Sequence, residues 1–264
     1  MTILDELAAY AAVRCAEAKT RVPPEAMTAA ALSLPKLDFA FEKALAAPGL
    51  SVICECKKAS PSRGLIAPEF PYLDIARTYE AAGADAVSVL TEPKWFLGSD
   101  AYLREIAGAL TIPCLRKDFI VDDYMIYEAR VLGASAVLLI TALLEEAELA
   151  RMIGICDELG LSALVEVHDA DEISRALRAG ARVVGVNNRN LKDFSVDTGN
   201  SGRLRELVPP EVIFVAESGI RGGADARALE SIGVDAVLVG ETMMRAADKA
   251  AVLADIKGVP YDTH

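Results

Sequence analysis

The sequence is poor in residues that bind transition metals, and it lacks the two commonest phosphate-binding motifs. Its 264 residues include two histidines, His168 and His264, and no C-x-x-C pair, so we do not expect a zinc site. Neither G-x-G-x-x-G nor G-x-x-x-x-G-K-[ST] occurs, which argues against a dinucleotide-binding fold and a P-loop. We therefore expect neither a metal nor a cofactor.

Positive charge and long apolar runs are also scarce. The formal net charge is −12 and the pI is near 4.7, which argues against nucleic acid or an anionic membrane as the partner. The longest apolar run, around 134–144, is far shorter than the ~20 residues of a membrane span. Residues 1–20 lack the apolar core of a signal peptide. Five scattered cysteines, mostly in apolar segments, are typical of reduced thiols, so we expect a cytoplasmic protein.

Hydrophobic residues, by contrast, make up 53% of the chain, and from Ser51 onward they alternate between strand and helix patterns. The expected strands cover 51–57, 85–90, 113–117, 135–140, 162–166, 182–187, 212–217 and 235–239. The expected helices lie near 71–82, 99–109, 122–132, 145–159, 170–179, 200–207, 223–232 and 241–257. Eight short β-then-α units predict an α/β protein with a closed (β/α)8 TIM barrel.

About fifty residues precede the first expected strand. Apolar residues at helical spacing predict a helix over 1–19, which Pro23-Pro24 ends, and a second short helix is expected over 39–47. We expect an N-terminal helical extension over 1–49 and a catalytic barrel over 50–258, which together form a single domain.

Charged residues stand at the carboxyl ends of several expected strands, where they are costly unless they are paired or used. Enzymes with this fold place their chemistry at these ends, so the pattern predicts an active site. On the third strand, Lys117 shares the parity of Leu115 and Phe119, and we place it inside the barrel. Cys54 and Cys56 have the opposite parity to Glu55 and should face the helices. The strand-end residues are Glu55, Lys57, Lys117, Glu166, Asn187, Arg189, Glu217, Ser218 and Gly240.

The last two strand ends also indicate an anion site. Ser218-Gly219 and Gly240-Glu241 each lead from a strand toward a helix, and barrels commonly bind phosphate after these two strands. Ordinary tight turns would give the same pattern. The Glu241 carboxylate must turn away if a phosphate binds there.

At these residues the sequence resembles indole-3-glycerol phosphate synthase, a tryptophan-pathway enzyme. The resemblance spans roughly 50–245 and implies a (β/α)8 carboxy-lyase without a cofactor. Its substrate would be 1-(2-carboxyphenylamino)-1-deoxyribulose 5-phosphate, which the family closes to indole-3-glycerol phosphate with loss of carbon dioxide and water. The matching runs are CECKKASPSRG (54–64), SVLTEPKWFLGS (88–99), PCLRKDFIVDDYMIYEAR (113–130), LVEVHD (164–169), GVNNRNLKDFSVD (185–197), VAESGI (215–220) and VLVGETMM (237–244).

The resemblance implies roles for the lysines and glutamates. Lys117 would be the general acid at the carbonyl oxygen, and Glu166 the general base or a partner in the dehydration. Lys57 would help to hold the substrate carboxylate, with an acid role in the dehydration left open, and Glu55 would orient the lysines. The implied catalytic set is Glu55, Lys57, Lys117, Glu166, Asn187 and Ser218.

The remaining matches imply binding roles. Substrate hydroxyls or the carboxylate would be held by Asn187, Arg189 and Glu217. The phosphate-side positions are Ser60, Ser218, Gly219 and Gly240. The aromatic ring would contact Pro61, Phe96, Phe119, Leu138, Leu191 and Leu238.

Two further expectations concern charge. A lysine that donates a proton at neutral pH is helped by burial or a neighbouring cation, so we expect the pKa of Lys117 to be lowered. His168 follows Glu166 by two residues, and we expect it at the rim beside Asp169 rather than as a base.

Two other functions share part of this pattern. Another phosphosugar barrel enzyme, such as a phosphoribosylanthranilate isomerase, would lack the K-K-A-S-P-S run and the pairing of Lys117 with Glu166. A catalytically inactive barrel that serves as a scaffold would carry substituted site residues, which this chain does not. We expect a small phosphosugar-anthranilate substrate, no nucleic acid and no membrane. A monomer or weak homo-oligomer is expected, and association with other tryptophan-pathway enzymes stays open.

Overall fold

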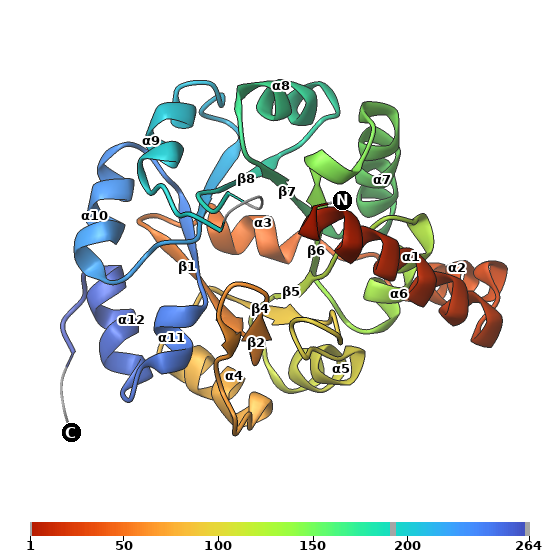
Figure 1. Cartoon of the computed structure of the whole chain (residues 1–264), viewed down its shortest axis with the longest axis horizontal. Coiled ribbons are helices and arrows are strands. Elements are labelled where there is room, and N and C mark those ends of the chain that lie inside the picture. The colour runs from red at the N-terminus through yellow and green to blue at the C-terminus, as the bar shows by residue number, and fades with distance from the viewer. Residues whose placement is uncertain (1, 191–193, 262–264) are drawn as a thin grey trace.

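The fold is a closed parallel barrel, and the computed structural model describes it over residues 2–190 and 194–261. Eight strands follow one another in the order β1-β10-β9-β8-β7-β6-β5-β4 (Figure 1). β1 pairs with both β10 and β4, so the sheet has no open edge. All eight expected strands are confirmed, and so is the TIM barrel. They are β1 (Ser51–Cys56), β4 (Ala86–Leu90), β5 (Cys114–Lys117), β6 (Ala136–Ile140), β7 (Ser162–Val167), β8 (Val183–Asn187), β9 (Ile213–Glu217) and β10 (Ala236–Val239).

A ring of helices surrounds the barrel (Figure 1). Glycines with positive φ end several of them, such as Gly83 after α4 and Gly133 after α6. The ring consists of α4 (Tyr72–Ala81), α5 (Asp100–Ala109), α6 (Asp123–Val131), α7 (Glu146–Leu159), α8 (Ala170–Arg178), α9 (Gly199–Arg205), α10 (Gly223–Ser231), α11 (Glu241–Arg245) and α12 (Lys249–Lys257), with a short 3-10 helix η1 (Thr141–Leu143).

Strand parity divides the apolar side chains into two cores. The larger lies between the strands and the helices and includes Cys54 and Cys56, which confirms that these thiols face outward. The smaller fills the barrel interior with residues such as Ile53, Leu115 and Leu164. Because both faces of every strand are buried, the strands are continuous apolar runs rather than alternating ones. The packed interior leaves the carboxyl-end rim as the place for a site.

The amino ends of the strands are closed by the helix α3 (Ala40–Leu45). Its Phe41 and Leu45 are fully buried in the interior core. The Glu42 N–H donates to the Ser162 hydroxyl at the start of β7, and the Ser51 hydroxyl at the start of β1 donates to the Leu45 carbonyl. The short helix expected over 39–47 is confirmed, and it closes the end of the barrel opposite the rim that carries the charged residues.

Two helix boundaries differ from expectation. Pro23-Pro24 ends α1 (Ile3–Arg21) as expected, but Pro24 then opens the helix α2 (Pro24–Ser33), because proline fits the first helical position. The final helix, expected over 241–257, is two helices. Asp248 caps α12 by accepting from the Ala251 N–H, so the chain starts a new helix there instead of continuing α11.

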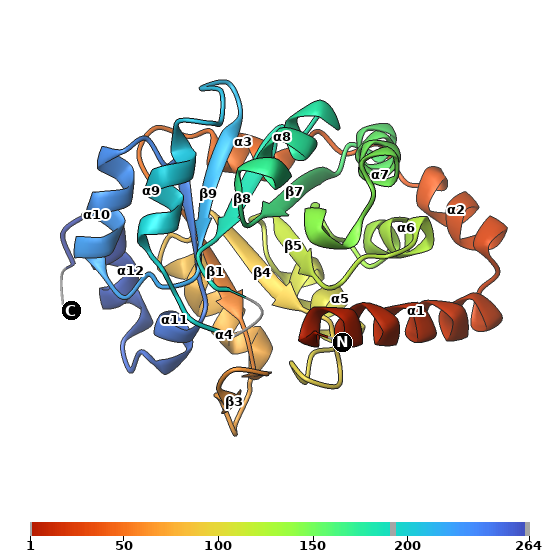
Figure 2. The same cartoon turned by 45° about the horizontal axis from the view of Figure 1, so that its top comes forward.

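The helix α1 belongs to the carboxyl-end side of the barrel. Its amino end lies near the barrel axis in Figure 1, and its residues Ile3, Leu4 and Leu7 line the cavity at the strand ends. A small hairpin of β2 (Ala59–Ser60) and β3 (Gly64–Leu65) projects from the same side (Figure 2). Among the described residues, no helix combines the length and apolar character required to cross a membrane.

Candidate active site at the carboxyl ends of the strands

One cavity of about 400 Å³ opens at the carboxyl ends of the strands. Every residue that the sequence predicted for the site lines this cavity except Leu191, which lies outside the described residues. The residues come from β1, β5, β6, β7, β8, β9 and β10, from the loops that follow them, and from the loop after β4. Side chains spread over almost the whole barrel sequence therefore meet in one place.

Lys57 and Glu55 form a buried ion pair at the end of β1. The Lys57 ammonium lies 2.6 Å from Glu55 Oε1, and the Ser88 hydroxyl donates to Glu55 Oε2 at 3.4 Å. Burial alone would raise the pKa of Glu55, but the charges of Lys57 and Lys117 outweigh it and hold that pKa below its usual value. Gly240 leaves room for the pair, because a Cβ there would lie 2.5 Å from Glu55 Oε1.

Lys117 lies between two carboxylates at the end of β5. Its Nζ is 3.6 Å from Glu166 Oε2 and 3.5 Å from Glu217 Oε2, so the inward placement is confirmed. The expected lowering of its pKa is wrong. Burial acts in that direction, but Glu217, Glu166 and Glu55 outweigh it and raise the pKa of Lys117. We call Glu55, Lys57, Lys117, Glu166 and Glu217 the inner cluster.

Glu217 is the least satisfied member of the inner cluster. Its side chain is 2% exposed, and among the described residues Oε1 has no hydrogen-bond partner. Burial raises the pKa of Glu217, and the neighbouring carboxylates Glu166 and Glu55 raise it further. The charge of Lys117 lowers it, and the pKa that results is about 7. Gly185 provides the space for Oε1, since a side chain at that position would overlap it. A buried acceptor without a partner is available to a ligand.

Asn187, Ser218 and Arg189 form a polar group at the ends of β8 and β9. Asn187 Oδ1 accepts from the Ser218 hydroxyl at 2.9 Å and from the Arg189 N–H at 3.0 Å. Arg189 in turn donates through Nη1 to the Phe194 carbonyl. These bonds fix the Asn187 amide, so that oxygen and nitrogen have defined positions at the cavity wall.

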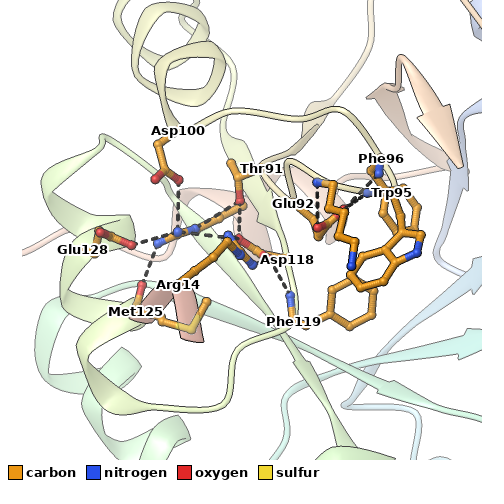
Figure 3. Close-up of polar contacts among 12 residues, drawn as sticks. Arg14, Thr91, Glu92, Trp95, Phe96, Asp100, Asp118, Phe119, Met125 and Glu128 are labelled. Carbon is orange, nitrogen blue, oxygen red and sulfur yellow. Dashed lines mark hydrogen bonds and ion pairs between the residues drawn. The ribbon is translucent and has the colours of Figure 1, made fainter. Parts of the chain in front are cut away.

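The opposite wall is apolar. Phe96 and Phe119 lie with ring centroids 6.0 Å apart, and Leu138 and Leu238 line the same cavity. The loop that carries Phe96 is held by the buried carboxylate of Glu92, which accepts from the Lys94, Trp95 and Phe96 N–H groups (Figure 3). The α1 residues Ile3, Leu4 and Leu7 complete the wall, and sequence reasoning missed them because helical periodicity does not say what a helix covers.

Basic residues gather where the sequence predicted an anion site. Ser218 and Gly219 both have positive φ, and Gly240 precedes α11, so backbone N–H groups lie at this end of the cavity. Three cations that were not predicted also line it, namely Arg63, Arg221 and Arg245. Glu241 forms ion pairs with Arg63 (3.0 Å) and Arg245 (3.1 Å), which neutralise its carboxylate. Arg63 and Arg221 each lie two residues after a predicted site residue, Pro61 and Gly219, which was the available signal.

His168 is also closer to the site than expected. It lies beside Asp169 as predicted, but its Nε2 is 3.4 Å from Glu166 Oε1 and its Nδ1 is 3.1 Å from Glu172 Oε2. Glu166 and His168 are two residues apart on β7 and its extension, so their shared parity was the signal. Burial would lower the pKa of His168, but the bond to Glu172 and the charges of Glu166, Glu172 and Glu217 raise it to about 9.

On the other side of β5, Arg116 lies in a second set of charges, between the barrel and α6. Arg116 is 1% exposed and donates to the Thr91 hydroxyl, the Met125 carbonyl and Asp100, with Glu128 at 2.8 Å (Figure 3). We call the second set the outer cluster: it comprises Arg14, Thr91, Asp100, Arg116, Asp118 and Glu128.

Arg14 joins this outer cluster from α1. Its two terminal nitrogens donate to the two oxygens of Asp118, at 3.2 and 2.6 Å. Asp118 also accepts from the Thr91 hydroxyl and the Phe119 N–H (Figure 3). The N-terminal extension is thereby fixed to the residue that follows Lys117. Within the described residues, no group of three or more His, Cys, Asp or Glu is arranged to hold a metal ion.

Comparison with known proteins gives consistent results. The family model described as indole-3-glycerol phosphate synthase matches residues 4–256. Proteins named indole-3-glycerol phosphate synthase from Ruminiclostridium cellulolyticum and Endomicrobium trichonymphae are 55% and 50% identical to this chain. Each alignment covers 97% of this chain and 99% of the relative.

Solved structures with little sequence similarity share the fold. A 3-hexulose-6-phosphate synthase (14% identical) covers 79% of this chain and 99% of its own, with a TM-score of 0.63. A thiamine phosphate pyrophosphorylase from Pyrococcus furiosus (18% identical) covers 83% of this chain and 96% of its own, with a TM-score of 0.61. At these identities the likeness supports the barrel alone.

Proposed function

The chain belongs to the indole-3-glycerol phosphate synthase family, and from this we propose how its cavity carries out the reaction. The protein is a carboxy-lyase of tryptophan biosynthesis. It closes 1-(2-carboxyphenylamino)-1-deoxyribulose 5-phosphate to indole-3-glycerol phosphate, with release of carbon dioxide and water. The ring carbon that bears the carboxylate attacks the ribulose carbonyl, and decarboxylation and dehydration follow.

Lys117 acts as the general acid at the carbonyl oxygen. The observation that carries this proposal is its position: a charged lysine 3.6 Å from Glu166 and 3.5 Å from Glu217, at the floor of a cavity with one aromatic wall. Its raised pKa keeps it protonated at neutral pH. The acid is thus protonated in the resting enzyme, and the developing oxyanion is stabilised by the ammonium charge in a site from which bound substrate excludes water.

Glu166 acts as the general base, or as a partner in the dehydration. Its Oε2 faces Lys117 and its Oε1 faces His168, so it lies between two cations. Glu55 orients Lys57 through their 2.6 Å contact, and Lys57 helps to hold the substrate carboxylate. Lys57 is also placed to act as an acid on the departing hydroxyl.

The remaining residues bind the substrate. Arg189, Asn187 and Glu217 hold hydroxyls or the carboxylate, and the free Glu217 Oε1 accepts from a substrate hydroxyl. The phosphate lies at the basic end, against backbone N–H groups after β9 and β10. The phosphate-side residues are Ser60, Ser218, Gly219 and Gly240. The anthranilate ring packs between the apolar side chains, which are Pro61, Phe96, Phe119, Leu138 and Leu238.

The direct test is to incubate the purified protein with the substrate and follow indole fluorescence, with Lys117→Met and Glu166→Gln as variants. The expected result is product formation by the native protein, with a drop in kcat of about 10²–10⁴-fold in each variant. Folded native protein without signal would instead indicate an inactive scaffold. The isomerase alternative predicts phosphoribosylanthranilate as the substrate and no release of carbon dioxide.

Beyond the reaction, we propose a cytoplasmic enzyme that works as a monomer or weak homo-oligomer. An acidic chain with five buried free cysteines supports the location. Residues 1–49 would form the N-terminal extension and residues 50–258 the catalytic barrel of one domain. Light scattering across a concentration series tests the oligomeric state. Co-elution with other tryptophan-pathway enzymes tests their association.

A further inference from the structure

The reaction consumes a proton. The substrate carboxylate is negative and the carbon dioxide it becomes is neutral, so each turnover takes up one proton from water. In the proposed function, on which this inference rests, lysines donate twice, to the carbonyl oxygen and to the departing hydroxyl, and Glu166 takes one proton back. After a turnover the lysines and Glu166 together are therefore one proton short.

A continuous set of titratable groups leads away from Lys117. Lys117 Nζ is 3.6 Å from Glu166 Oε2, and the other oxygen of Glu166 is 3.4 Å from His168 Nε2. His168 Nδ1 is 3.1 Å from Glu172 Oε2, and the same oxygen accepts from the His168 N–H at 2.8 Å. Asp169 and Glu172 have the D-x-x-E spacing of a capping box, in which Glu172 would reach back to the Asp169 N–H. The structure differs, because Asp169 caps α8 while Glu172 holds His168 by ring and backbone.

This set of groups crosses from one cavity to another. His168 and Glu172 line a second cavity of about 510 Å³, whose rim includes the exposed residues Asp169 and Asp197. Asn187 and Arg189 line both cavities. Substrate fills the first cavity during turnover and excludes water from Lys117. The side of Glu166 that faces His168 then remains the side nearer to water.

His168 has the charge that this position requires. Its side chain is 19% exposed, and the surrounding carboxylates Glu166, Glu172 and Glu217 raise its pKa to about 9. The imidazole is therefore an imidazolium at neutral pH, with a proton on each nitrogen. Its Nε2, buried and without a hydrogen bond among the described residues, lies toward the Glu166 carboxylate.

We propose that His168, held by Glu172, supplies through Glu166 the proton that each turnover consumes, and replaces it from water in the second cavity. Glu166 first returns the proton it took during the reaction to a neutral lysine and becomes a carboxylate. The Nε2–H bond of His168 then breaks and a bond to Glu166 Oε1 forms. The carboxyl group turns about its Cγ–Cδ bond and protonates the neutral amine of Lys117. The imidazole keeps its proton on Nδ1, and Nε2 takes a new one from hydronium when the ring swings into the second cavity. His168 thus acts through Glu166 and does not touch the substrate.

The test separates the first turnover from later ones. Resting enzyme holds its lysine protons, so His168→Ala should form the first product per site at the native rate in rapid-mixing experiments. Later turnovers should be about tenfold or more slower, with KM within about twofold of native. Free imidazole is the probe: it fits the space left by His168→Ala and should restore the later turnovers in proportion to its concentration. It should leave the native enzyme unchanged.

Matched variants separate proton supply from structure. His168→Asn fills the space with an uncharged amide, so it should show the same slow later turnovers without rescue by imidazole. Glu172→Gln keeps an acceptor for the His168 N–H but loses the charge, and should slow later turnovers a few-fold. Asp169→Asn is the control, because asparagine caps a helix equally well and its side-chain oxygen can still accept from the Glu172 N–H, which leaves Glu172 in place. It should match the native enzyme.

Two outcomes would overturn the proposal. One is equal rates for the first and later turnovers in His168→Ala. The other is a first turnover slowed as much as later ones and no response to imidazole, which would show a structural role. Thermal unfolding of each variant is measured first, and if His168→Ala does not fold, Glu172→Gln and His168→Asn provide the same comparison of turnovers. Native enzyme that forms no product would defeat the proposed function itself, a result distinct from either of these.

Discussion

Arg116 and Lys117 are adjacent on β5 but point to opposite sides of the sheet. The outer cluster around Arg116 and the inner cluster around Lys117 differ in how completely their polar atoms are hydrogen-bonded. On the outside, Asp118 has both oxygens in hydrogen bonds, to Arg14, to Thr91 and to the Phe119 N–H. Arg116 donates from all three of its nitrogens. Within the outer cluster, Arg14 Nε is the only buried side-chain nitrogen or oxygen that has no hydrogen-bond partner among the described residues.

The inner cluster, one residue along the strand, is charged just as densely but is not saturated. Lys117 is 3.5 Å or more from its two carboxylate partners, longer than a charge-assisted hydrogen bond. Glu217 Oε1 has no partner among the described residues. Polar groups whose hydrogen bonds are all made within the protein stabilise the fold. Polar atoms without a partner can instead form hydrogen bonds to a ligand. We therefore assign the outer cluster to structure and the inner cluster to chemistry, and four predictions test this division.

The largest effect is expected for Lys117→Met. It removes the proposed acid and should lower kcat by about 10²–10⁴-fold while the barrel remains folded. Steady-state indole fluorescence and circular dichroism measure the two properties. Turnover within tenfold of native would place the acid elsewhere.

Arg116→Met makes the same change one residue away and should have the opposite consequence. Without the buried guanidinium, the carboxylates of Asp118 and Glu128 lose a positive charge that neutralises them, which should lower the free energy of unfolding by about 3–5 kcal/mol. The kcat of the folded fraction should stay within a few-fold of native. Urea unfolding at neutral pH gives the first quantity and active-site titration the second. If Arg116→Met abolished turnover in folded protein, the outer cluster would have a chemical role.

Glu217→Gln should raise the stability of the protein at neutral and higher pH and lower its kcat. The pKa of Glu217 is about 7 in the folded protein against 4.5 as its model value, so the folded state binds more protons between these two pH values. Its ionisation therefore costs stability as pH rises from 4.5 to 7, and the full cost is present above 7. The variant should equal native stability below pH 4.5 and exceed it by on the order of 2–3 kcal/mol at pH 8, with kcat reduced. The free energy of unfolding of both proteins is measured across this pH range. A difference between variant and native protein that stays constant with pH would contradict the prediction.

The smallest effects compare two glycines. Gly240→Ala places a Cβ 2.5 Å from Glu55 Oε1 and 2.8 Å from Lys57 Nζ, so the ion pair must shift. A displacement of this size should lower kcat about tenfold with little change in stability. Gly154→Ala, inside α7 with nothing within 4 Å, is the control and should add about 0.5–1 kcal/mol of stability at native kcat. Equal kinetics in both variants would remove the steric role of Gly240.

The two clusters also show which features of the site can be predicted from the sequence and which cannot. Strand parity alone placed Lys117 inside and Cys54 outside the barrel. Successive side chains of a strand alternate between its two faces, so only neighbouring residues are needed to assign them. The sign of the Lys117 pKa shift could not be predicted, since it depends on distances to Glu166 and Glu217, which lie about 50 and 100 residues away in sequence. Burial and carboxylates act in opposite directions there, and only the geometry decides which is larger.

Long-range packing explains the other differences. The sequence contained the apolar residues of α1, but nothing local indicates that they line the cavity. Parity shared with Glu166 was a local signal for His168, but whether the two side chains meet depends on how the chain leaves β7. The break before α12 depends on a single cap at Asp248, which lies within an otherwise helical pattern.

The most direct measurement is a crystal structure of the protein with indole-3-glycerol phosphate bound. We expect Lys117 Nζ and Glu217 Oε1 each to gain a hydrogen bond to the ligand, while the contacts of Arg116 and Asp118 stay as they are. A ligand that leaves Glu217 Oε1 without a partner, or that rearranges the outer cluster in order to bind, would contradict the division between the two sides of β5.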